Sequence, residues 1–378
     1  MTMKIVADAN IIEIESSFRE LGELVLIPGR KISNADLIDA DALLIRSVTR
    51  VDRSLLDGTA VRFIATASSG VDHIDLDYLA DQDIGFADAK GSNANAVVDY
   101  CFAALAFALL KQKIAVAELE VGIIGGGRVG GLFANKLAGL GIAHRVYDPF
   151  LGVRGSHCRT LEEAMQCQLV SLHVPLTHAG AHPTAKLVGA KQLELLPADS
   201  VLINTCRGAV VDEHALTELL TERADITTVF DVWENEPDID VSLALRVDIA
   251  TPHIAGYSQP AKVAATECIL RAFQRYFSPI EPGRDTVTTA AGKTPPTPIG
   301  WRQGSELPQW ETLLDVLPLT QISQEFKQSL AGGTDLSAFD EFRNSLMQRL
   351  EFKNYSIERE QWDRSSLKLF AAMGFKWV

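Results

Sequence analysis

Short apolar runs alternate with longer polar stretches over the first hundred residues, and this pattern predicts alternating strands and helices, as in an α/β fold. Because strands that alternate with helices form parallel sheets, we expect a sheet covered by helices. A long apolar-rich helix is predicted next over 93–112, with Ser92 or Asn93 as its cap. The candidate strands of this first series lie at 5–7, 42–46, 61–66 and 84–87.

A second series of the same kind begins at Glu120. The run at 121–124 has the uniformly apolar character of a strand that is buried on both faces. Helices are predicted over 128–140 and from Ser258 to about Tyr276. Further strands are predicted at 144–147, 169–173, 201–204, 227–230 and 248–250. The sequence therefore predicts an α/β protein with two Rossmann-like, doubly wound halves.

The pattern changes after Pro279. Residues 281–298 are rich in Pro, Gly and Thr, which is typical of a linker. The remaining residues end in an apparent strand–helix–strand pattern. We expect a smaller α+β domain at this end of the chain.

The amino-acid composition argues against several classes of function. The chain has 378 residues and a formal net charge of −14, which argues against a nucleic-acid or acidic-membrane partner. No run approaches the roughly 20 apolar residues of a membrane span, and the N-terminus lacks the features of a signal peptide. Neither the five cysteines nor the eight histidines have metal-ligand spacing, so we expect no metal and no disulfide. A cytoplasmic enzyme is the favoured interpretation.

A glycine-rich segment at 125–130 carries the first candidate chemistry. Gly125, Gly127 and Gly130 fit the pattern G-x-G-x-x-G between a predicted strand and a predicted helix. In such a turn the glycines let the backbone approach a pyrophosphate at the helix N-terminus. Asp148 follows at nearly the spacing expected of the acid that binds the adenosine ribose, and its charge favours NAD over NADP. The alternative is a tight turn without a ligand.

Three further motifs each follow a predicted strand of the second series, where an open parallel sheet places its ligands. They are NTCRG at 204–208, DVWENEP at 231–237 and TPHIAG at 251–256. Oxidation of a 2-hydroxy acid needs a base, which an imidazole such as His253 supplies. Glu236 is the matching carboxylate for its other ring nitrogen, and Arg207 is a planar cation for the substrate carboxylate. Taken singly, each residue also fits a cap, a helix start or a surface charge.

The motifs GIIGGGRVG, HVPLT, NTCRGAVVDE, FDVWENEP and TPHIAG together resemble the D-isomer-specific 2-hydroxyacid dehydrogenase family over about 1–280. The resemblance implies an NAD-dependent enzyme whose catalytic trio is Arg207, Glu236 and His253. Asp231 is implied as the partner of the nicotinamide carboxamide. The implied cofactor-binding residues are Gly125, Gly127, Arg128, Val129, Gly130, Asp148, Pro175, Thr205, Cys206, Arg207, Asp231 and Gly256.

The resemblance also implies a domain plan. Residues 1–95 and 258–282 form a substrate-binding domain, and 96–257 form an NAD-binding Rossmann domain. The linker covers 283–298, and 299–378 form a C-terminal domain through which the chain makes a homodimer. On that plan, Arg343 or Arg349 of the tail reaching a partner's active site is a hypothesis.

Local segments resemble the branch of this family whose substrate carries a terminal phosphate. They are ALLIRSVTR at 42–50, TASSGVDH at 66–73, HIAGYS at 253–258 and FDEFR at 339–343. Candidate substrate-binding residues are Arg46, Ser47, Ser68 and Tyr257, with Arg50 equally compatible with a surface role. Phosphoglycerate or another 2-hydroxy acid is the alternative substrate. A non-catalytic NAD(H) sensor is less favoured, because a sensor has no need of the trio.

Overall fold

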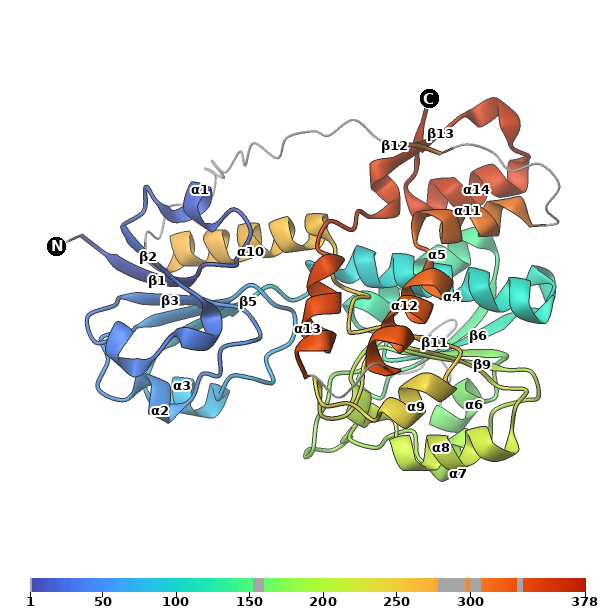
Figure 1. Ribbon diagram of the computed structural model, residues 1–378, viewed down its shortest axis with the longest axis horizontal. Coiled ribbons are helices and arrows are strands. Elements are labelled where there is room, and N and C mark those ends of the chain that lie inside the picture. The colour runs from blue at the N-terminus through green and yellow to red at the C-terminus, as the bar shows by residue number, and fades with distance from the viewer. Residues whose placement is uncertain (1, 152–159, 278–296, 300–306, 332–335) are drawn as a thin grey trace. The chain divides into compact units, whose positions relative to one another are not determined.

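The computed structural model describes residues 2–151, 160–277, 297–299, 307–331 and 336–378 (Figure 1). The chain divides into two compact units. Unit 1 consists of residues 1–93 and 259–294, and unit 2 consists of residues 94–258 and 295–378. Unit 1 is therefore discontinuous in sequence, because its last helix follows the whole central part of unit 2.

Unit 1 is built on a five-stranded parallel sheet with the order β2-β1-β3-β4-β5. Its strands are β1 (Lys4–Asp8), β2 (Glu23–Ile27), β3 (Ala42–Ile45), β4 (Phe63–Thr66) and β5 (Gly85–Asp88). Its helices are α1 (Ile14–Phe18), α2 (Arg53–Leu56), α3 (Leu76–Asp81) and α10 (Gln259–Phe277). The predicted strands of the first series are thus confirmed, and β2 is an additional strand at the edge of the sheet.

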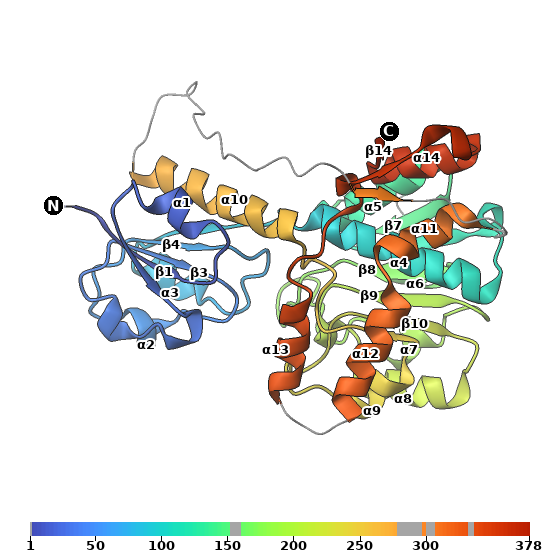
Figure 2. The same ribbon diagram turned by 45° about the horizontal axis from the view of Figure 1, so that its top comes forward.

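Helices cover both faces of this sheet, and Figure 2 shows α1 and α10 together on one of them. On one face Ile269 and Phe273 of α10 pack against sheet residues such as Ile5 and Leu44. On the other face leucines of α2 and α3 pack against residues such as Leu43. Burial of apolar side chains on both faces explains why the middle residues of β1, β3 and β4 are apolar.

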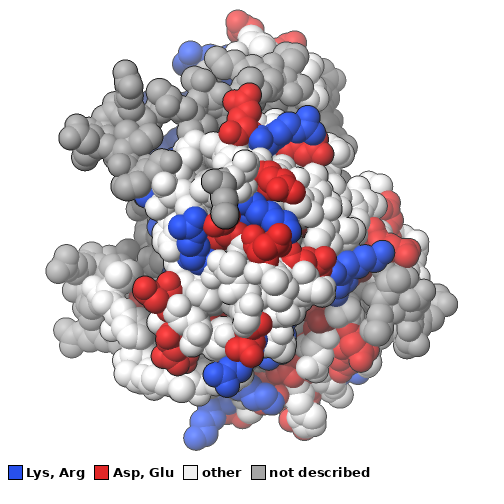
Figure 3. Space-filling view, turned by 90° about the vertical axis from the view of Figure 1, so that its left-hand side faces the viewer, with Lys and Arg blue, Asp and Glu red and all other residues white. Residues whose placement is uncertain are grey.

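Basic and acidic side chains lie next to one another on the face shown in Figure 3. This mixture agrees with exposed ion pairs of unit 1, such as Lys4–Asp39 and Arg62–Asp41. Positive charge is therefore balanced locally on this face, whereas nucleic-acid-binding surfaces gather it into one field.

Unit 2 contains a six-stranded parallel sheet with the order β11-β10-β9-β8-β6-β7. Its strands are β6 (Glu120–Ile124), β7 (Ala143–Tyr147), β8 (Leu169–Leu172), β9 (Val201–Asn204), β10 (Thr227–Phe230) and β11 (Ile249–Ala250). The helices of this part are α4 (Ala94–Gln112), α5 (Arg128–Leu140), α6 (Leu161–Met165), α7 (Ala190–Leu193), α8 (Glu213–Glu222) and α9 (Val241–Arg246). The predicted bounds of α5 agree with the structure.

Helix α4 is long and apolar enough to cross a membrane by length and composition alone. Its residues are buried around most of its circumference, because it packs against α5, the sheet and the C-terminal helix α11 (Pro308–Val316). A helix that is apolar on all sides needs such partners on all sides. The prediction of a buried core helix at this position is confirmed.

The C-terminal residues pack within unit 2 and add a small parallel sheet with the order β12-β13-β14. The strands are β12 (Thr297–Ile299), β13 (Tyr355–Ile357) and β14 (Lys376–Trp377). The helices are α11, α12 (Leu319–Ala331), α13 (Leu336–Ser345) and α14 (Arg364–Met373). The predicted linker is too long at its end, because Thr297 and Pro298 pair with β13. Residues 283–296 of that linker lie outside the described residues.

Candidate functional site

The glycine-rich turn after β6 has the backbone shape that a dinucleotide phosphate requires. Gly125 has φ = +96°, a conformation that residues with side chains rarely adopt. A Cβ atom on Gly130 would lie only 1.9 Å from the carbonyl oxygen of Gly125, whereas no described atom lies within 4 Å of a Cβ on Gly127. The turn is therefore closed on its inner side and open at Gly127, where α5 begins and no side chain caps its first N–H groups.

Asp148 fixes this turn from the end of the neighbouring strand β7. Its Oδ2 accepts the N–H of Gly126 at 2.9 Å, and its Oδ1 accepts the N–H of Phe150 at 3.0 Å. The acid that the sequence places beside a ribose thus also orders the backbone that faces the phosphates. Of the predicted cofactor positions in the first turn of α5, Arg128 is exposed and Val129 is half-buried.

Strands β8 and β9 end in further predicted cofactor positions. Pro175 is exposed, and its carbonyl oxygen accepts the hydroxyl of Thr184 at 2.5 Å. Thr205 and Cys206 are buried directly after β9. Burial raises the pKa of the Cys206 thiol to about 11, so this thiol is protonated at neutral pH and is not a nucleophile.

The loop after β9 is joined closely to the loop after β10. Arg207 donates from Nη1 to the carbonyl oxygen of Cys206 at 2.7 Å. A Cβ atom on the next residue, Gly208, would lie 1.9 Å from the carbonyl carbon of Trp233. Because Trp233 begins the turn that carries Glu236, the absence of a side chain at Gly208 sets the approach of these two loops.

The imidazole of His253 and the carboxylate of Glu236 form the central contact of the site. Nδ1 of His253 lies 2.7 Å from Oε2 of Glu236, and Oε1 of Glu236 accepts the N–H of Trp233 at 2.8 Å. Burial acts to raise the pKa of Glu236, but the charge and hydrogen bond of His253, with the Trp233 N–H, lower that pKa below its ordinary value. Glu236 is therefore ionised at neutral pH and orients the ring through Nδ1, which leaves Nε2 for a reacting group.

A second acid, Asp231, holds the backbone of the loop that carries His253. Its Oδ1 accepts the N–H of Ile254 at 2.7 Å and the hydroxyl of Thr251 at 2.6 Å, and its Oδ2 accepts the N–H of Ala255 at 2.8 Å. The N–H of His253 donates to the backbone carbonyl oxygen of Asp231 at 2.6 Å. Complete burial raises the pKa of Asp231 to about 6, although the charge of His253 and these hydrogen bonds act to lower it.

Two residues of the site have a left-handed backbone. His253 has φ = +56°, and Asn235, directly before Glu236, has φ = +59°. This conformation costs about 1–2 kcal/mol in a residue with a side chain and persists only where the surroundings enforce it. Both members of the Glu236–His253 pair are thus presented by enforced turns. Gly256, a predicted cofactor position, lies half-buried in the same loop as His253.

Sequence reasoning missed two buried groups behind this pair. Oε1 of Glu213 accepts the N–H of Glu234 at 2.8 Å, and burial, followed by the charges of nearby acids, raises the pKa of Glu213 to about 7. The hydroxyl of Tyr100 on α4 lies 2.7 Å from Oγ1 of Thr251. No local sequence motif predicts either contact, because each contact joins two segments that are separated in the chain.

The predicted substrate residues of unit 1 lie at the carboxyl ends of β3 and β4. Nε of Arg46 donates to Oδ2 of the buried Asp8 at 2.8 Å. The hydroxyl of Ser68 donates to the carbonyl oxygen of Gly70 at 2.9 Å, and Ser47 is exposed. Because its guanidinium is fixed through one nitrogen, Arg46 presents an oriented cation at this edge of the sheet.

Arg50 differs from Arg46 in its surroundings. Its side chain is 84% exposed and pairs with Asp52 at 3.0 Å. An exposed ion pair of this kind is typical of a solvated surface. The surface interpretation of Arg50 is therefore favoured.

The C-terminal segment contacts the loop that follows His253. The hydroxyl of Tyr257 donates to Oδ1 of Asn344 at 3.1 Å, and the guanidinium of Arg343 lies 4.9 Å from the centre of the Tyr257 ring. Nη2 of Arg349 donates to the carbonyl oxygen of Ala255 at 2.6 Å. The guanidinium of Arg349 is thus engaged by backbone of its own chain, and contact of Arg343 or Arg349 with a partner's site stays a prediction.

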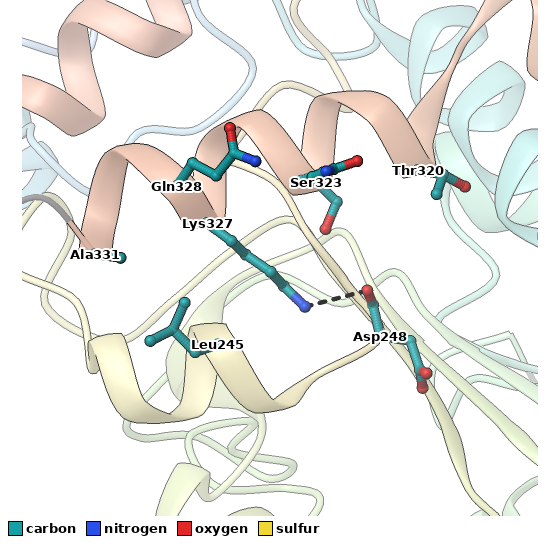
Figure 4. A pocket seen from close by; sticks show the side chains of 8 residues that line it. Leu245, Asp248, Thr320, Ser323, Lys327, Gln328 and Ala331 are labelled. Carbon is teal, nitrogen blue, oxygen red and sulfur yellow. Dashed lines mark hydrogen bonds between the residues drawn. The ribbon is translucent and has the colours of Figure 1, made fainter.

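The groove in Figure 4 lies apart from these loops. It is lined by Leu245, Asp248, Thr320, Ser323, Gln324, Lys327, Gln328 and Ala331. Asp248 precedes β11, whereas the motif with His253 follows β11, so the groove is at the opposite end of that strand. Lys327 donates there to the carbonyl oxygens of Val247 and Asp248 and so attaches α12 to the body of unit 2.

Comparison with known proteins agrees with this geometry. Residues 108–255 match the model for the NAD binding domain of D-isomer specific 2-hydroxyacid dehydrogenases. An erythronate-4-phosphate dehydrogenase of Hahella chejuensis is 38% identical over 379 residues, which cover 99% of each chain. Another, from Azotobacter vinelandii, is 46% identical over 273 residues, or 72% of each chain. The crystal structure of NAD⁺-bound 3-phosphoglycerate dehydrogenase from Entamoeba histolytica matches with a TM-score of 0.63 and 25% identity, over 74% of this chain and 97% of that chain.

Proposed function

Because the chain belongs to the erythronate-4-phosphate dehydrogenases, within the D-isomer specific 2-hydroxyacid dehydrogenase family, we propose that it oxidises 4-phospho-D-erythronate at C2. The product is (R)-3-hydroxy-2-oxo-4-phosphobutanoate, and the expected role is in the biosynthesis of pyridoxal 5′-phosphate. The observation that carries the proposal is the contact between His253 and Glu236 on two enforced turns of the sheet that also holds the glycine-rich turn. This arrangement supplies an oriented base next to a nucleotide site.

NAD is the cofactor that the residues fit. The turn is open at Gly127 and closed at Gly130, which suits a pyrophosphate lying on the N-terminus of α5. The Asp148 carboxylate accepts hydrogen bonds from ribose hydroxyls and repels a 2′-phosphate. When bound, NAD supplies the hydride acceptor, and Asp231 is the proposed partner of its carboxamide. Pro175, Thr205, Cys206 and Gly256 complete the proposed contacts at the ends of the neighbouring strands.

The protein's own residues move the proton and hold the substrate. Nε2 of His253 takes the proton of the C2 hydroxyl as the C2 hydrogen leaves as hydride and the C–O bond becomes a carbonyl. Glu236, ionised at neutral pH, stabilises the imidazolium that forms. Arg207 binds the carboxylate and the developing carbonyl oxygen as a planar cation.

The phosphate end of the substrate is assigned to a second set of residues. Arg46 supplies the cation, and Ser47, Ser68 and Tyr257 supply hydroxyl groups. The support is the orientation of Arg46 by the buried Asp8, which fixes a guanidinium without covering it. On this proposal residues 1–95 with 258–282 bind substrate and residues 96–257 bind NAD.

The C-terminal residues 299–378 are the proposed dimerisation region of a cytoplasmic homodimer that acts on a small phosphorylated acid and on neither nucleic acid nor membrane. The support is the small sheet, whose edge strand β14 is exposed and includes Trp377. Exposed strand edges and aromatic side chains favour association. Sedimentation equilibrium tests the dimer, and deletion of residues 297–378 is not a suitable test because these residues complete the core of unit 2.

Turnover of three acids by the full-length protein tests the activity. We expect reduction of NAD with 4-phospho-D-erythronate and at most a hundredth of that rate with 3-phosphoglycerate or D-lactate. Protein and NAD at equal concentrations reveal a single turnover even if product release is slow. Turnover of 3-phosphoglycerate alone would keep the mechanism and overturn the substrate. Tight NAD binding without turnover of any acid would favour the sensor.

A further inference from the structure

The loop 253–257 is held through its backbone from two sides. From the sheet, Asp231 accepts the N–H groups of Ile254 and Ala255. From the C-terminal segment, Arg349 donates from Nη2 to the carbonyl oxygen of Ala255 at 2.6 Å and from Nε to that of Tyr257 at 3.3 Å. A carboxylate thus binds two N–H groups of this loop, and a guanidinium binds two of its carbonyl oxygens.

Acidic groups surround the guanidinium of Arg349 within unit 2. Burial lowers its pKa, and the charges of Asp99, Asp231 and Glu351 oppose that change. Two of these acids tie the C-terminal segment to the same region. Asp99 accepts the N–H of Phe352 at 2.8 Å, and Glu351 accepts the hydroxyl of Ser258 at 2.8 Å.

We propose that Arg349 is a positioning residue for the hydride-transfer reaction, which holds the loop of His253 in its reactive shape through the carbonyl oxygens of Ala255 and Tyr257. The proposal rests on the proposed function of His253. It assigns the C-terminal segment a part in the catalysis of its own chain, in addition to any part in assembly.

The backbone of His253 makes such a restraint necessary. Its left-handed conformation is unfavourable for a residue with a side chain, so neighbouring bonds must enforce it. Asp231 fixes the N–H groups directly after His253, but it leaves the carbonyl oxygens of Ala255 and Tyr257 to other donors. Without Arg349 this part of the loop loses two hydrogen bonds to its carbonyl oxygens, which weakens its restraint and lets Nε2 shift from the hydroxyl group. A displacement of 1 Å at such a site costs on the order of 100-fold in rate.

Lys327 offers a matched control for the structural part of this role. It too is a cation of the C-terminal segment that donates to backbone carbonyl oxygens of unit 2, but it does so before β11. Arg349→Met and Lys327→Met each remove one cation and its carbonyl contacts. Only Arg349→Met removes hydrogen bonds to the loop that carries His253.

The experiment compares kcat, KM and melting temperature of wild type, Arg349→Met, Arg349→Lys and Lys327→Met with 4-phospho-D-erythronate. We expect kcat to fall about 100-fold in Arg349→Met, with KM changed less than about threefold. Arg349→Lys keeps the charge and one donor and regains about tenfold. Lys327→Met lowers the melting temperature while kcat stays within about twofold of wild type.

The pH profile separates positioning from loss of folded protein. The charges that face Asp231 are His253 and Arg349, together with the hydroxyl of Tyr100. Protonation of Asp231 weakens its hold on the N–H groups of Ile254 and Ala255, and removing the Arg349 cation raises the pKa of Asp231. The acid limb of kcat therefore moves to higher pH in Arg349→Met only. Equal losses of kcat in Arg349→Met and Lys327→Met, or an unmoved acid limb, would overturn the proposal. If Arg349→Met does not fold, kcat alone is compared between Arg349→Lys and Lys327→Arg, because Lys keeps the charge and leaves the acid limb in place. Inactive wild type would instead refute the function itself.

Discussion

The two large sheets of this protein share one strand order and differ in the residues that follow their strands at the carboxyl ends. Counted along the chain, unit 1 has the order 2-1-3-4-5 (β2-β1-β3-β4-β5), and unit 2 has the same order with one strand more (β7-β6-β8-β9-β10-β11). In unit 2, β6 leads through three glycines into α5. In unit 1, β1 leads through Asp8 and Asn10 into the five-residue α1.

The difference lies in which groups each edge presents. Asp8, at the end of β1, accepts the N–H groups of Asn10 and Gly29, so its carboxylate binds backbone of unit 1. The same carboxylate also holds the side chain of Arg46 at this edge of the sheet. The glycine-rich turn of unit 2 instead leaves space at Gly127, where no described atom lies within 4 Å of an added Cβ. One scaffold thus carries a side-chain cation at one edge and, at the other, the turn that we propose as a backbone anion site. Loop residues, and not strand order, assign the chemistry.

Replacement of His253, the proposed base in unit 2, is expected to have the largest effect on activity. In His253→Gln we expect kcat to fall about 1,000-fold, because general-base catalysis contributes 10²–10⁴. NADH affinity, measured by fluorescence titration, remains within about twofold. The exposed His214 provides the control variant His214→Gln, with unchanged kcat. A loss of less than about tenfold for His253→Gln would show that another group takes the proton.

The backbone anion site is tested by adding one methyl group. A Cβ at Gly130 meets the carbonyl oxygen of Gly125 at 1.9 Å, so the turn must open in Gly130→Ala. We expect NAD affinity to fall about 100-fold, a loss of about 3 kcal/mol in binding free energy. Gly139→Ala on the same helix is the matched control, since no described atom lies within 4 Å of its Cβ. If both variants bind NAD alike, the turn is not the phosphate site.

The side-chain cation of unit 1 is tested by Arg46→Met against Arg50→Met. Loss of a charge-assisted contact to phosphate is worth about 1.5–3 kcal/mol, so we expect KM for the phosphorylated acid to rise about 10- to 100-fold in Arg46→Met. Arg50, exposed and paired with Asp52, is expected to leave KM within about threefold. Isothermal titration with substrate and initial-rate kinetics distinguish the two variants. A larger effect at Arg50 would reverse their assignments.

The smallest predicted effect concerns pH. In the described part of unit 1, hydrogen bonds lower the pKa of three carboxyl groups, those of Asp36, Asp39 and Asp52. In unit 2, burial raises the pKa of Glu213 to about 7. The folded protein therefore binds this proton more tightly than the unfolded chain, and the free energy of unfolding falls as pH rises from about 4.5 to about 7.

Glu213→Gln keeps the acceptor for the N–H of Glu234 and removes that titration. We expect the variant to gain about 1 kcal/mol over wild type between pH 4.5 and pH 7, with allowance for the solvent that reaches the carboxyl group. Urea unfolding at several pH values measures the difference. Below pH 4.5 the gain vanishes, because both states of the wild type are then protonated. Glu218→Gln, at an exposed position, is the control.

Sequence periodicity predicted the architecture because most strands here are buried and short. The run that became β3 is apolar throughout, and those that became β4 and β6 are apolar except for one terminal residue each. The glycine-rich turn marked the start of α5 at Arg128. The edge strand β2 escaped prediction, since it alternates poorly and its residues are only half-buried. Local pattern therefore sufficed wherever burial was complete.

The candidate site was predictable to the extent that its residues follow strands directly. Glu236 and His253 are near their strand ends, so parallel topology alone brings them together. Arg349 lies 94 residues from Ala255, and Asp99 lies 253 residues from Phe352. Contacts over such separations depend on how the C-terminal segment packs, which no local motif specifies.

The discontinuity of unit 1 has a consequence for synthesis of the chain. One face of its sheet, with residues such as Ile5 and Leu44, is covered by Ile269 and Phe273 of α10. A ribosome that adds about 5–20 residues per second needs roughly 10–30 s to pass through residues 94–258 before α10 emerges. During that interval the nascent sheet exposes an apolar face. The core on this face of unit 1 is therefore completed only after the central segment has been made, and translation speed across that segment sets the length of the delay.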